Sequence, residues 1–155
     1  MAATEGQPAP ALDLPTDGGG HVSLAALKGK PAVVYFYPKD DTTGCTREAQ
    51  DFTALAPDFA ALGAAVIGVS KDTVKKHDRF KAKHDLGVIL ASDEDGAACE
   101  AWGVWVQKQL YGREYMGIER ATFLIDVDGN VARVWRKVTV AGHAAQVLEA
   151  TRALP

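Results

Sequence analysis

The hydrophobic pattern of the chain contains three stretches that are continuously apolar and rich in β-branched residues. They lie at residues 32–37, 64–70 and 88–90. Such runs are typical of strands that are buried on both faces of a parallel sheet. The first run is unbroken and also carries aromatic residues, so we expect it to lie centrally in the sheet.

Between these strands the apolar residues recur at intervals of three and four, which predicts helices. One long helix should begin near Thr43, with apolar residues at positions 52, 55, 59 and 62. A second should run from Asp72, its expected N-cap, to about residue 84. A short third helix should pass through Cys99 and Trp102.

The two ends of the chain add two hairpins and a helix. Residues 121–126 and 131–135 are predicted strands joined by a turn that contains Asp128-Gly129, and a helix follows at about residues 142–153. The first 30 residues predict a small edge hairpin with a glycine-rich tip. No linker interrupts this order, so we expect a single domain over residues 1–155. Its fold class is α/β, with three layers and a sheet that is parallel at first and antiparallel at the end.

Composition narrows the classes of function. Hydrophobic residues make up 47% of the 155 residues and charged residues 24%, as in ordinary globular proteins. The net charge of −3 argues against a nucleic-acid binder, and no apolar run approaches the roughly 20 residues of a membrane span. No secretory signal is visible, so we expect a cytoplasmic protein. Two cysteines are too few for a disulfide scaffold, which leaves catalytic, metal-binding or plain buried roles.

Cys45 is the most informative position. It lies in the predicted first turn of a helix, where free N–H groups and the helix dipole favour an anion and therefore a thiolate. The hydroxyl of Thr42 could lie beside the sulfur, and Arg47 and Arg120 are candidate cationic partners. A buried, inert cysteine at a helix start fits the position of Cys45 equally well.

The residues around Cys45 resemble the peroxiredoxin signature, which is a proline, three residues, Thr or Ser, two residues and the peroxide-attacking cysteine. Here these are Pro38, Thr42 and Cys45. The resemblance is to the bacterioferritin comigratory protein branch, also called peroxiredoxin Q, and it extends over essentially the whole chain. Further similar segments are residues 69–72, 92–96, 99–105, 115–118 and 120–126.

The resemblance implies a thioredoxin-like fold with a mixed central sheet flanked by helices. It also implies a thiol peroxidase that reduces hydrogen peroxide and organic hydroperoxides through a cysteine sulfenic acid, in antioxidant defence. No metal, haem or flavin cofactor is expected. The expected partners are the hydroperoxide and a reductant, either thioredoxin or another thiol, and the branch is often monomeric.

Four residues receive roles from the resemblance. Cys45 would be the peroxidatic cysteine, Thr42 the hydroxyl that orients peroxide and sulfur, Pro38 the residue that shields the thiolate, and Arg120 the arginine over the sulfur. Attack on an O–O bond requires such a thiolate and such donors. Taken alone, Thr42 would be interpreted as a helix cap, and Arg120 as a surface arginine paired with a neighbouring carboxylate, Glu119 or Asp126.

The sequence departs from the branch at two positions. Thr43 stands where many members have proline, which should loosen the loop slightly. Gln50 stands where the usual resolving cysteine lies, so the familiar disulfide cannot form. Cys99 is the only other thiol. It is either a resolving residue or a small apolar residue packed near Trp102.

Two rival functions use the same fold. A disulfide oxidoreductase would need Cys-x-x-Cys at the helix start, but Glu48 occupies the second position. A redox-fold binding or chaperone module would leave Cys45 idle, without peroxidase turnover. His77 and His84 could share a helix face, but two histidines without a third ligand make a poor metal site, so we interpret both as surface residues.

Overall fold

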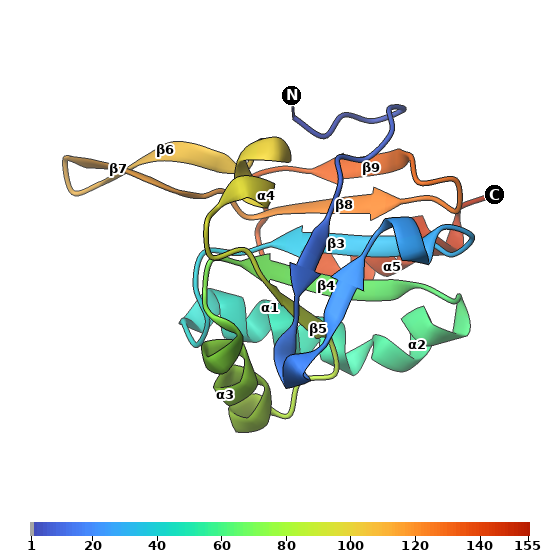
Figure 1. The fold of residues 1–155 in the computed structure, drawn as a ribbon, viewed down its shortest axis with the longest axis horizontal. Helices are drawn as coiled ribbons and strands as arrows, with labels where there is room; N and C mark the ends of the chain where they lie inside the picture. The colour runs from blue at the N-terminus through green and yellow to red at the C-terminus, as the bar shows by residue number, and fades with distance from the viewer. Residues whose placement is uncertain (1) are drawn as a thin grey trace.

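The computed structural model describes residues 2–155 and has a central five-stranded sheet in the order β5-β4-β3-β8-β9 (Figure 1). The strands are β3 (Ala32–Phe36), β4 (Ala65–Ser70), β5 (Ile89–Ser92), β8 (Ala121–Ile125) and β9 (Val131–Trp135). β3 pairs with β4, and β4 with β5, in parallel, whereas β8 and β9 are antiparallel. The mixed sheet and the central place of the first apolar run are therefore confirmed.

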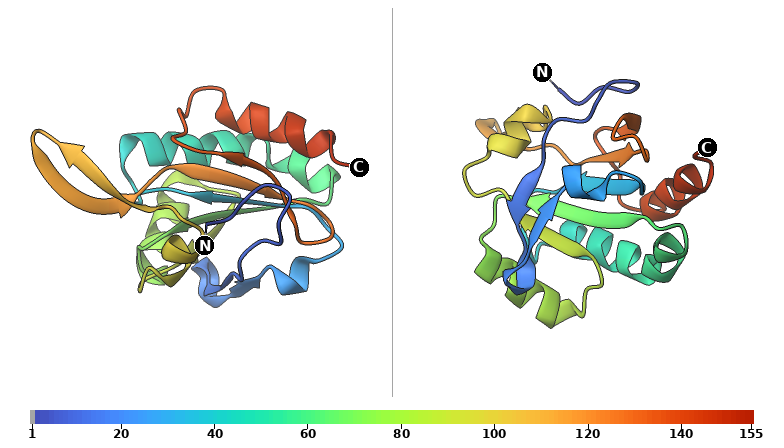
Figure 2. Two further views of the ribbon diagram at one scale, coloured as in Figure 1. Left: turned by 90° about the horizontal axis from the view of Figure 1, so that it is seen from above. Right: turned by 45° about the vertical axis from the view of Figure 1, so that its right-hand side comes forward.

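Two layers cover the sheet. The helices α1 (Thr43–Ala54), α2 (Ala56–Ala61) and α5 (His143–Arg152) lie on one face (Figure 2). The other face carries α4 (Ala97–Ala101) and the hairpin of β1 (Asp13–Pro15) and β2 (His21–Ser23). α3 (Val74–His84) packs beside the edge strand β5. Within the described part of the chain, no helix is long and apolar enough to cross a membrane.

Two helix boundaries differ from the predicted ones. The long helix expected from Thr43 is broken at Leu55, because Pro57 has no N–H to continue the ladder and its ring would clash with the preceding turn. Pro57 instead lies in the first turn of α2, where proline is tolerated. The N-cap of α3 is Thr73, whose hydroxyl accepts the N–H of Lys76 at 3.1 Å, so the expectation for Asp72 was wrong.

An antiparallel hairpin of β6 (Trp105–Leu110) and β7 (Arg113–Ile118) was not predicted. It projects from the body of the protein at the left of Figure 1. Its two-residue turn, Tyr111-Gly112, has positive φ at both positions (52° and 77°), as a hairpin turn of this length requires. Tyr-Gly is a weak turn signal and the strands are largely polar, so the hydrophobic pattern does not predict this hairpin.

Candidate active site

Cys45 is the third residue of α1, directly after the loop that leaves the central strand β3. Its side chain points toward the sheet and is only 2% exposed, packed in the same core cluster as Ala49 and Phe52. The position in the first turn confirms the predicted helix start. Unpaired N–H groups and the positive end of the helix dipole therefore lie beside the sulfur.

Arg120 joins this helix from the connection between β7 and β8, 75 residues along the chain. Its Nη2 donates to Cys45 Sγ at 3.4 Å, and its Nη1 donates to Glu48 Oε1 at 2.6 Å. Gly44 permits this approach, since a Cβ there would lie 3.2 Å from Nη2. The guanidinium thus divides its donors between a thiol and a carboxyl group.

The alternative interpretation of Arg120, as a surface arginine paired with a neighbouring carboxylate, does not describe its geometry. Glu119 is paired with Arg136 at 2.9 Å, and Asp126 accepts backbone N–H groups in the β8–β9 turn. The Arg120 side chain is only 17% exposed. Arg47, the other candidate cation, is an exposed residue of α1.

Glu48 is a member of this site that the sequence analysis did not assign to it. Its side chain is 2% exposed, and burial raises the pKa of the carboxyl group to about 7, against the lowering effect of Arg120. Among residues 2–155, neither its second oxygen, Oε2, nor the hydroxyl of the nearby Tyr35 has a hydrogen-bond partner. Cys45, Glu48, Ala49 and Phe52 follow the spacing i, i+3, i+4 and i+7 of one buried helix face, and that signal could have identified Glu48.

The loop before α1 holds Pro38 and Thr42, and both residues are exposed. The hydroxyl of Thr42 donates to the carbonyl of Lys39 at 2.9 Å, and its own carbonyl accepts the N–H of Thr46 at 2.8 Å. Thr42 is therefore the N-cap residue of α1 by its backbone, with its side chain turned back along the loop. The hydrogen bond of its hydroxyl is to Lys39 and not to the sulfur.

A buried ion pair holds the same loop against α3. Asp40 accepts from Tyr37 Oη and from His77 Nδ1, each at 2.6 Å, and His77 Nε2 donates to the carbonyl of Ala91 at 3.0 Å. Burial alone would lower the pKa of His77, but the hydrogen bond and charge of Asp40 outweigh it and raise that pKa. His77 is fully buried, so its interpretation as a surface histidine was wrong.

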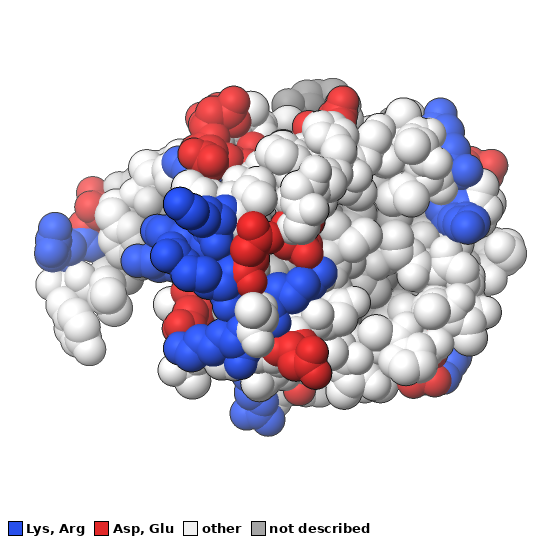
Figure 3. Space-filling view, turned by 60° about the horizontal axis from the view of Figure 1, so that its bottom comes forward, with Lys and Arg blue, Asp and Glu red and all other residues white. Residues whose placement is uncertain are grey.

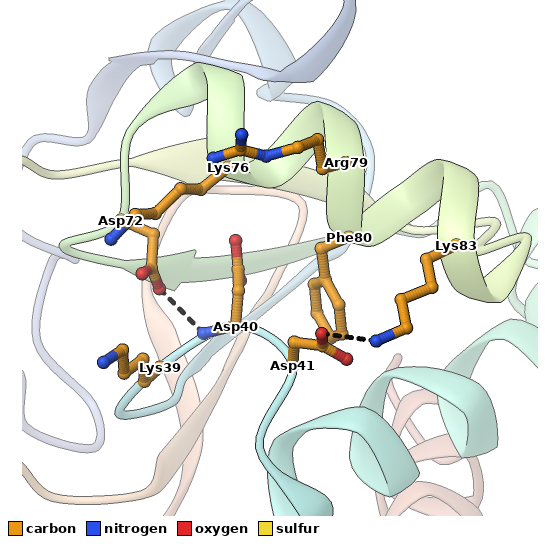
Figure 4. A pocket seen from close by; sticks show the side chains of 8 residues that line it. All are labelled: Lys39, Asp40, Asp41, Asp72, Lys76, Arg79, Phe80 and Lys83. Atoms are coloured by element: carbon orange, nitrogen blue, oxygen red, sulfur yellow. Dashed lines mark hydrogen bonds and ion pairs between the residues drawn. The ribbon is translucent and has the colours of Figure 1, made fainter.

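A pocket of about 330 Å³ lies between this loop and α3 (Figure 4). Two contacts visible there tie the loop to its surroundings: Asp40 N–H donates to Asp72 at 2.8 Å, and Lys83 donates to Asp41 at 2.7 Å. His84 also bonds Asp41, at 2.8 Å. Basic side chains gather on this face among a few acidic ones (Figure 3). The pocket is lined by Lys39, Asp40, Asp41, Asp72, Lys76, Arg79, Phe80 and Lys83.

Cys99 is separated from these residues. It is fully buried in α4, in the core cluster that also contains Phe36 and Trp102 on the other face of the sheet. Burial raises the pKa of its thiol, and the hydrogen bond and charge of Asp93 raise it further. The structure therefore brings together Cys45 and Arg120, places Thr42 and Pro38 in the adjoining loop, and keeps Cys99 apart.

Comparison with known proteins shows the family of this chain. Residues 5–134 match the model of the AhpC/TSA family, and the chain belongs to that family. It is 50% identical to "Peroxiredoxin Bcp" of Bacillus subtilis over 149 residues, which cover 96% of this chain and 95% of that protein. A "Putative peroxiredoxin bcp" of Coxiella burnetii is also 50% identical, over 96% of this chain and 98% of its own length.

Solved structures place the fold in the same group. The bacterioferritin comigratory protein of Xanthomonas campestris, whose structures were described in terms of alkyl peroxide reduction, has a TM-score of 0.87 and 49% identity, covering 92% of this chain and 90% of that one. The peroxidoxin BcpB of Mycobacterium tuberculosis has a TM-score of 0.86 and 33% identity, covering 99% of both chains. The resemblance of the sequence to peroxiredoxins and the thioredoxin-like fold are confirmed.

Proposed function

We propose that the protein is a thiol-dependent peroxidase that reduces hydrogen peroxide and organic hydroperoxides, with Cys45 as the nucleophile. The observation that carries the proposal is the guanidinium of Arg120 on the sulfur of a cysteine in the first turn of α1. The relatives named peroxiredoxins, and the description of alkyl peroxide reduction for the Xanthomonas protein, support the same chemistry.

The geometry supports attack by the Cys45 thiolate on one peroxide oxygen. An S–O bond forms while the O–O bond breaks, and the departing oxygen takes a proton to leave as water or an alcohol. Cys45 becomes a sulfenic acid. Arg120 and the N–H groups of the first helical turn stabilise the negative charge that passes from sulfur to the departing oxygen.

Thr42 and Pro38 belong to the proposal as residues that shape the peroxide site. The single proton of the Thr42 hydroxyl is engaged by the carbonyl of Lys39, so the hydroxyl offers its lone pairs to the O–H of a peroxide. Pro38 begins the loop and carries no N–H that would compete for the substrate. In these roles Thr42 orients the peroxide and Pro38 shields the thiolate.

An external thiol completes the cycle in this proposal. One thiol displaces water from the sulfenic acid to form a mixed disulfide with Cys45, and a second thiol releases the reduced enzyme. The reductant is thioredoxin or another thiol. We further propose that the chain works as one domain and as a monomer in the cytoplasm, where such thiols are kept reduced.

Peroxide consumption by the purified protein with excess dithiothreitol tests the proposal. The wild type should consume hydrogen peroxide catalytically, and Cys45→Ser should abolish the activity. Cys99→Ser is the matched control, because it changes the other buried thiol on the far face of the sheet. An inactive wild type whose Cys45 is not oxidised would instead support the binding or chaperone module.

A further inference from the structure

We propose that Glu48 and Cys45 hold one proton between them around the guanidinium of Arg120, and that Glu48 gives up this proton when Cys45 is oxidised. In the reduced protein Cys45 is then a thiolate and Glu48 a carboxylic acid. In the oxidised protein Glu48 is the anion paired with Arg120. The inference rests on the proposed peroxidase function and assigns a further residue to it.

The geometry of the guanidinium is the first observation. Nη1 is 2.6 Å from Glu48 Oε1 and Nη2 is 3.4 Å from Cys45 Sγ, so both acidic groups share one cation. Each of the two side chains is only 2% exposed. Two buried anions on a single cation would leave one negative charge uncompensated in a medium of low polarity, which is costly. One of the two groups is therefore expected to retain its proton.

The second observation is the position of the free carboxyl oxygen. Glu48 Oε2 is buried, and within residues 2–155 it receives no hydrogen bond. A carboxylate so placed would lack donors on one oxygen, whereas a carboxylic acid carries its own O–H there. The hydroxyl of Tyr35 also has no partner in this part of the structure, and the charge of Glu48 contributes to raising its pKa, which places the two groups near each other.

The other charged and titratable groups near this pair leave the proton on Glu48. Burial of Glu48 favours the acid form and outweighs the opposing charge and hydrogen bond of Arg120, and Asp51 on α1 adds to the effect of burial, so the pKa of the carboxyl group is raised to about 7. On α5, burial lowers the pKa of His143 to about 4, with Arg120 adding to the effect, so His143 is neutral and hydrogen-bonded to Thr122 at 2.7 Å. Lys108 on β6 is a further cation near this pair; it interacts with Cys45 and not with Glu48, so it favours the negative charge on the sulfur and leaves the proton on the carboxyl group.

Oxidation removes the reason for retaining the proton. The thiolate attacks the peroxide ROOH, the S–O bond forms, the O–O bond breaks and RO⁻ departs as ROH. Cys45 is now a neutral sulfenic acid, and among residues 2–155 Glu48 is the one carboxyl group that forms an ion pair with Arg120. The balanced step is Cys45–S⁻ + Glu48–COOH + ROOH → Cys45–SOH + Glu48–COO⁻ + ROH. The charge of the site is unchanged, and no proton is taken from solution.

Infrared difference spectroscopy of the reduced and oxidised protein tests this inference. One equivalent of hydrogen peroxide is added at about pH 6, where an ordinary exposed glutamate is ionised and only a perturbed carboxyl group still carries its proton. The wild type should lose the C=O stretch of one protonated carboxyl group on oxidation. Glu48→Gln should not show this loss. Glu149→Gln, which changes the carboxyl of an exposed Glu–Arg pair on α5, should show it unchanged.

Proton uptake in weakly buffered solution is the second measurement, with oxidation of Cys45 counted by alkylation and mass spectrometry. At about pH 6, the number of protons taken up per oxidised Cys45 should be lower in the wild type than in Glu48→Gln. The difference should be close to one proton. An oxidised wild type that loses no carboxyl band and matches the variant in proton uptake would overturn the inference. A wild type in which Cys45 is not oxidised would overturn the proposed peroxidase function itself. The wild-type spectrum decides the question even where the variant fails to fold.

Discussion

Cys45 and Cys99 lie on opposite faces of the central sheet. Cys45 belongs to the core cluster beneath α1 and α5, together with Tyr35 of β3, whereas Cys99 packs with Phe36, the next residue of the same strand. Because successive side chains of a strand point to opposite faces, β3 itself separates the two thiols. A bond between them would require unfolding of much more than the first turn of α1.

This separation predicts that Cys99 does not resolve the oxidised enzyme. Cys99→Ser should retain full turnover with dithiothreitol, because the buried Cys99 thiol, with its raised pKa, is a poor nucleophile. Non-reducing peptide mapping after one equivalent of peroxide should recover Cys45 as a sulfenic acid or its adduct. Quantitative recovery of a linked Cys45–Cys99 peptide from the monomer would falsify external resolution and make Cys99 the resolving residue.

Arg120→Lys should slow the oxidation of Cys45 by about 10²–10³, the usual cost of one donor that stabilises developing charge. Lysine keeps the charge but cannot bond Glu48 and Cys45 at once with a planar fork. Stopped-flow oxidation by hydrogen peroxide measures the rate. Arg133→Lys, at an exposed arginine stacked on Trp135, is the control and should match the wild type. Equal rates for both variants would remove Arg120 from the site.

Thr42→Val should also slow the peroxide step, whereas Thr42→Ser should stay close to the wild type. Valine preserves the shape of the side chain but removes both the acceptor lone pairs and the bond to the Lys39 carbonyl. Serine keeps the hydroxyl. Single-turnover rates against peroxide concentration separate the two variants, and a Thr42→Val enzyme as fast as Thr42→Ser would show that the hydroxyl only stabilises the loop.

The Asp40–His77 pair should make stability depend on pH. The pKa of His77 is raised in the folded protein, so its contribution is fully present below the unfolded value of 6.5 and is lost as pH rises through the raised pKa. His77→Gln leaves Asp40 without its buried cation and should lower the free energy of unfolding by about 3–5 kcal/mol at about pH 6. Urea unfolding across the pH range should show this loss shrink as pH rises. A pH-independent loss would contradict the ion pair.

The strands of the sheet could be predicted from the sequence because burial on both faces leaves an unbroken apolar run, as in Ala32–Phe36. The β6–β7 hairpin could not be, since its strands face solvent and Tyr111-Gly112 is a weak turn signal. The break at Leu55 was missed because the apolar spacing continues through it. Pro57 is the residue that indicates the break, because a proline inside a helix removes a hydrogen bond and clashes with the preceding turn even where the apolar spacing is helical.

Some residues of the candidate active site could likewise be predicted from the sequence, and others could not. Helical position alone identified Cys45 as a candidate, but Arg120 was joined to it only by resemblance, since no local spacing connects residues 75 positions apart. The buried side chains of Glu48 and His77 were missed because a carboxyl or imidazole on a helix is usually solvated. Each is buried here with a partner from a distant segment, and such pairs are set by tertiary packing.

The contact between Gly68 and Tyr35 yields the last prediction, on the packing beneath Cys45. The two residues are partners in the β3–β4 ladder, and a Cβ at Gly68 would lie 2.6 Å from Tyr35 Cζ and 2.7 Å from its hydroxyl oxygen. The Tyr35 ring cannot move aside, since it is fully buried and stacked on Phe52 at 4.7 Å. Gly68→Ala should therefore lower the free energy of unfolding by about 1–3 kcal/mol.

Gly87→Ala is the control for this substitution, because its Cβ would meet Thr53 at an ordinary 3.4 Å, and it should stay within about 0.5 kcal/mol of the wild type. Tyr35→Phe removes a hydroxyl that has no partner within residues 2–155, so this change alone should cost little. In the Gly68→Ala background the same change should recover part of the loss, because it removes one of the two close contacts. Urea unfolding of the two single variants and the double variant measures the coupling. If the losses of the two single variants simply add in the double variant, Gly68 is required for its backbone conformation. It is then not required because the absence of a side chain leaves room for the Tyr35 hydroxyl.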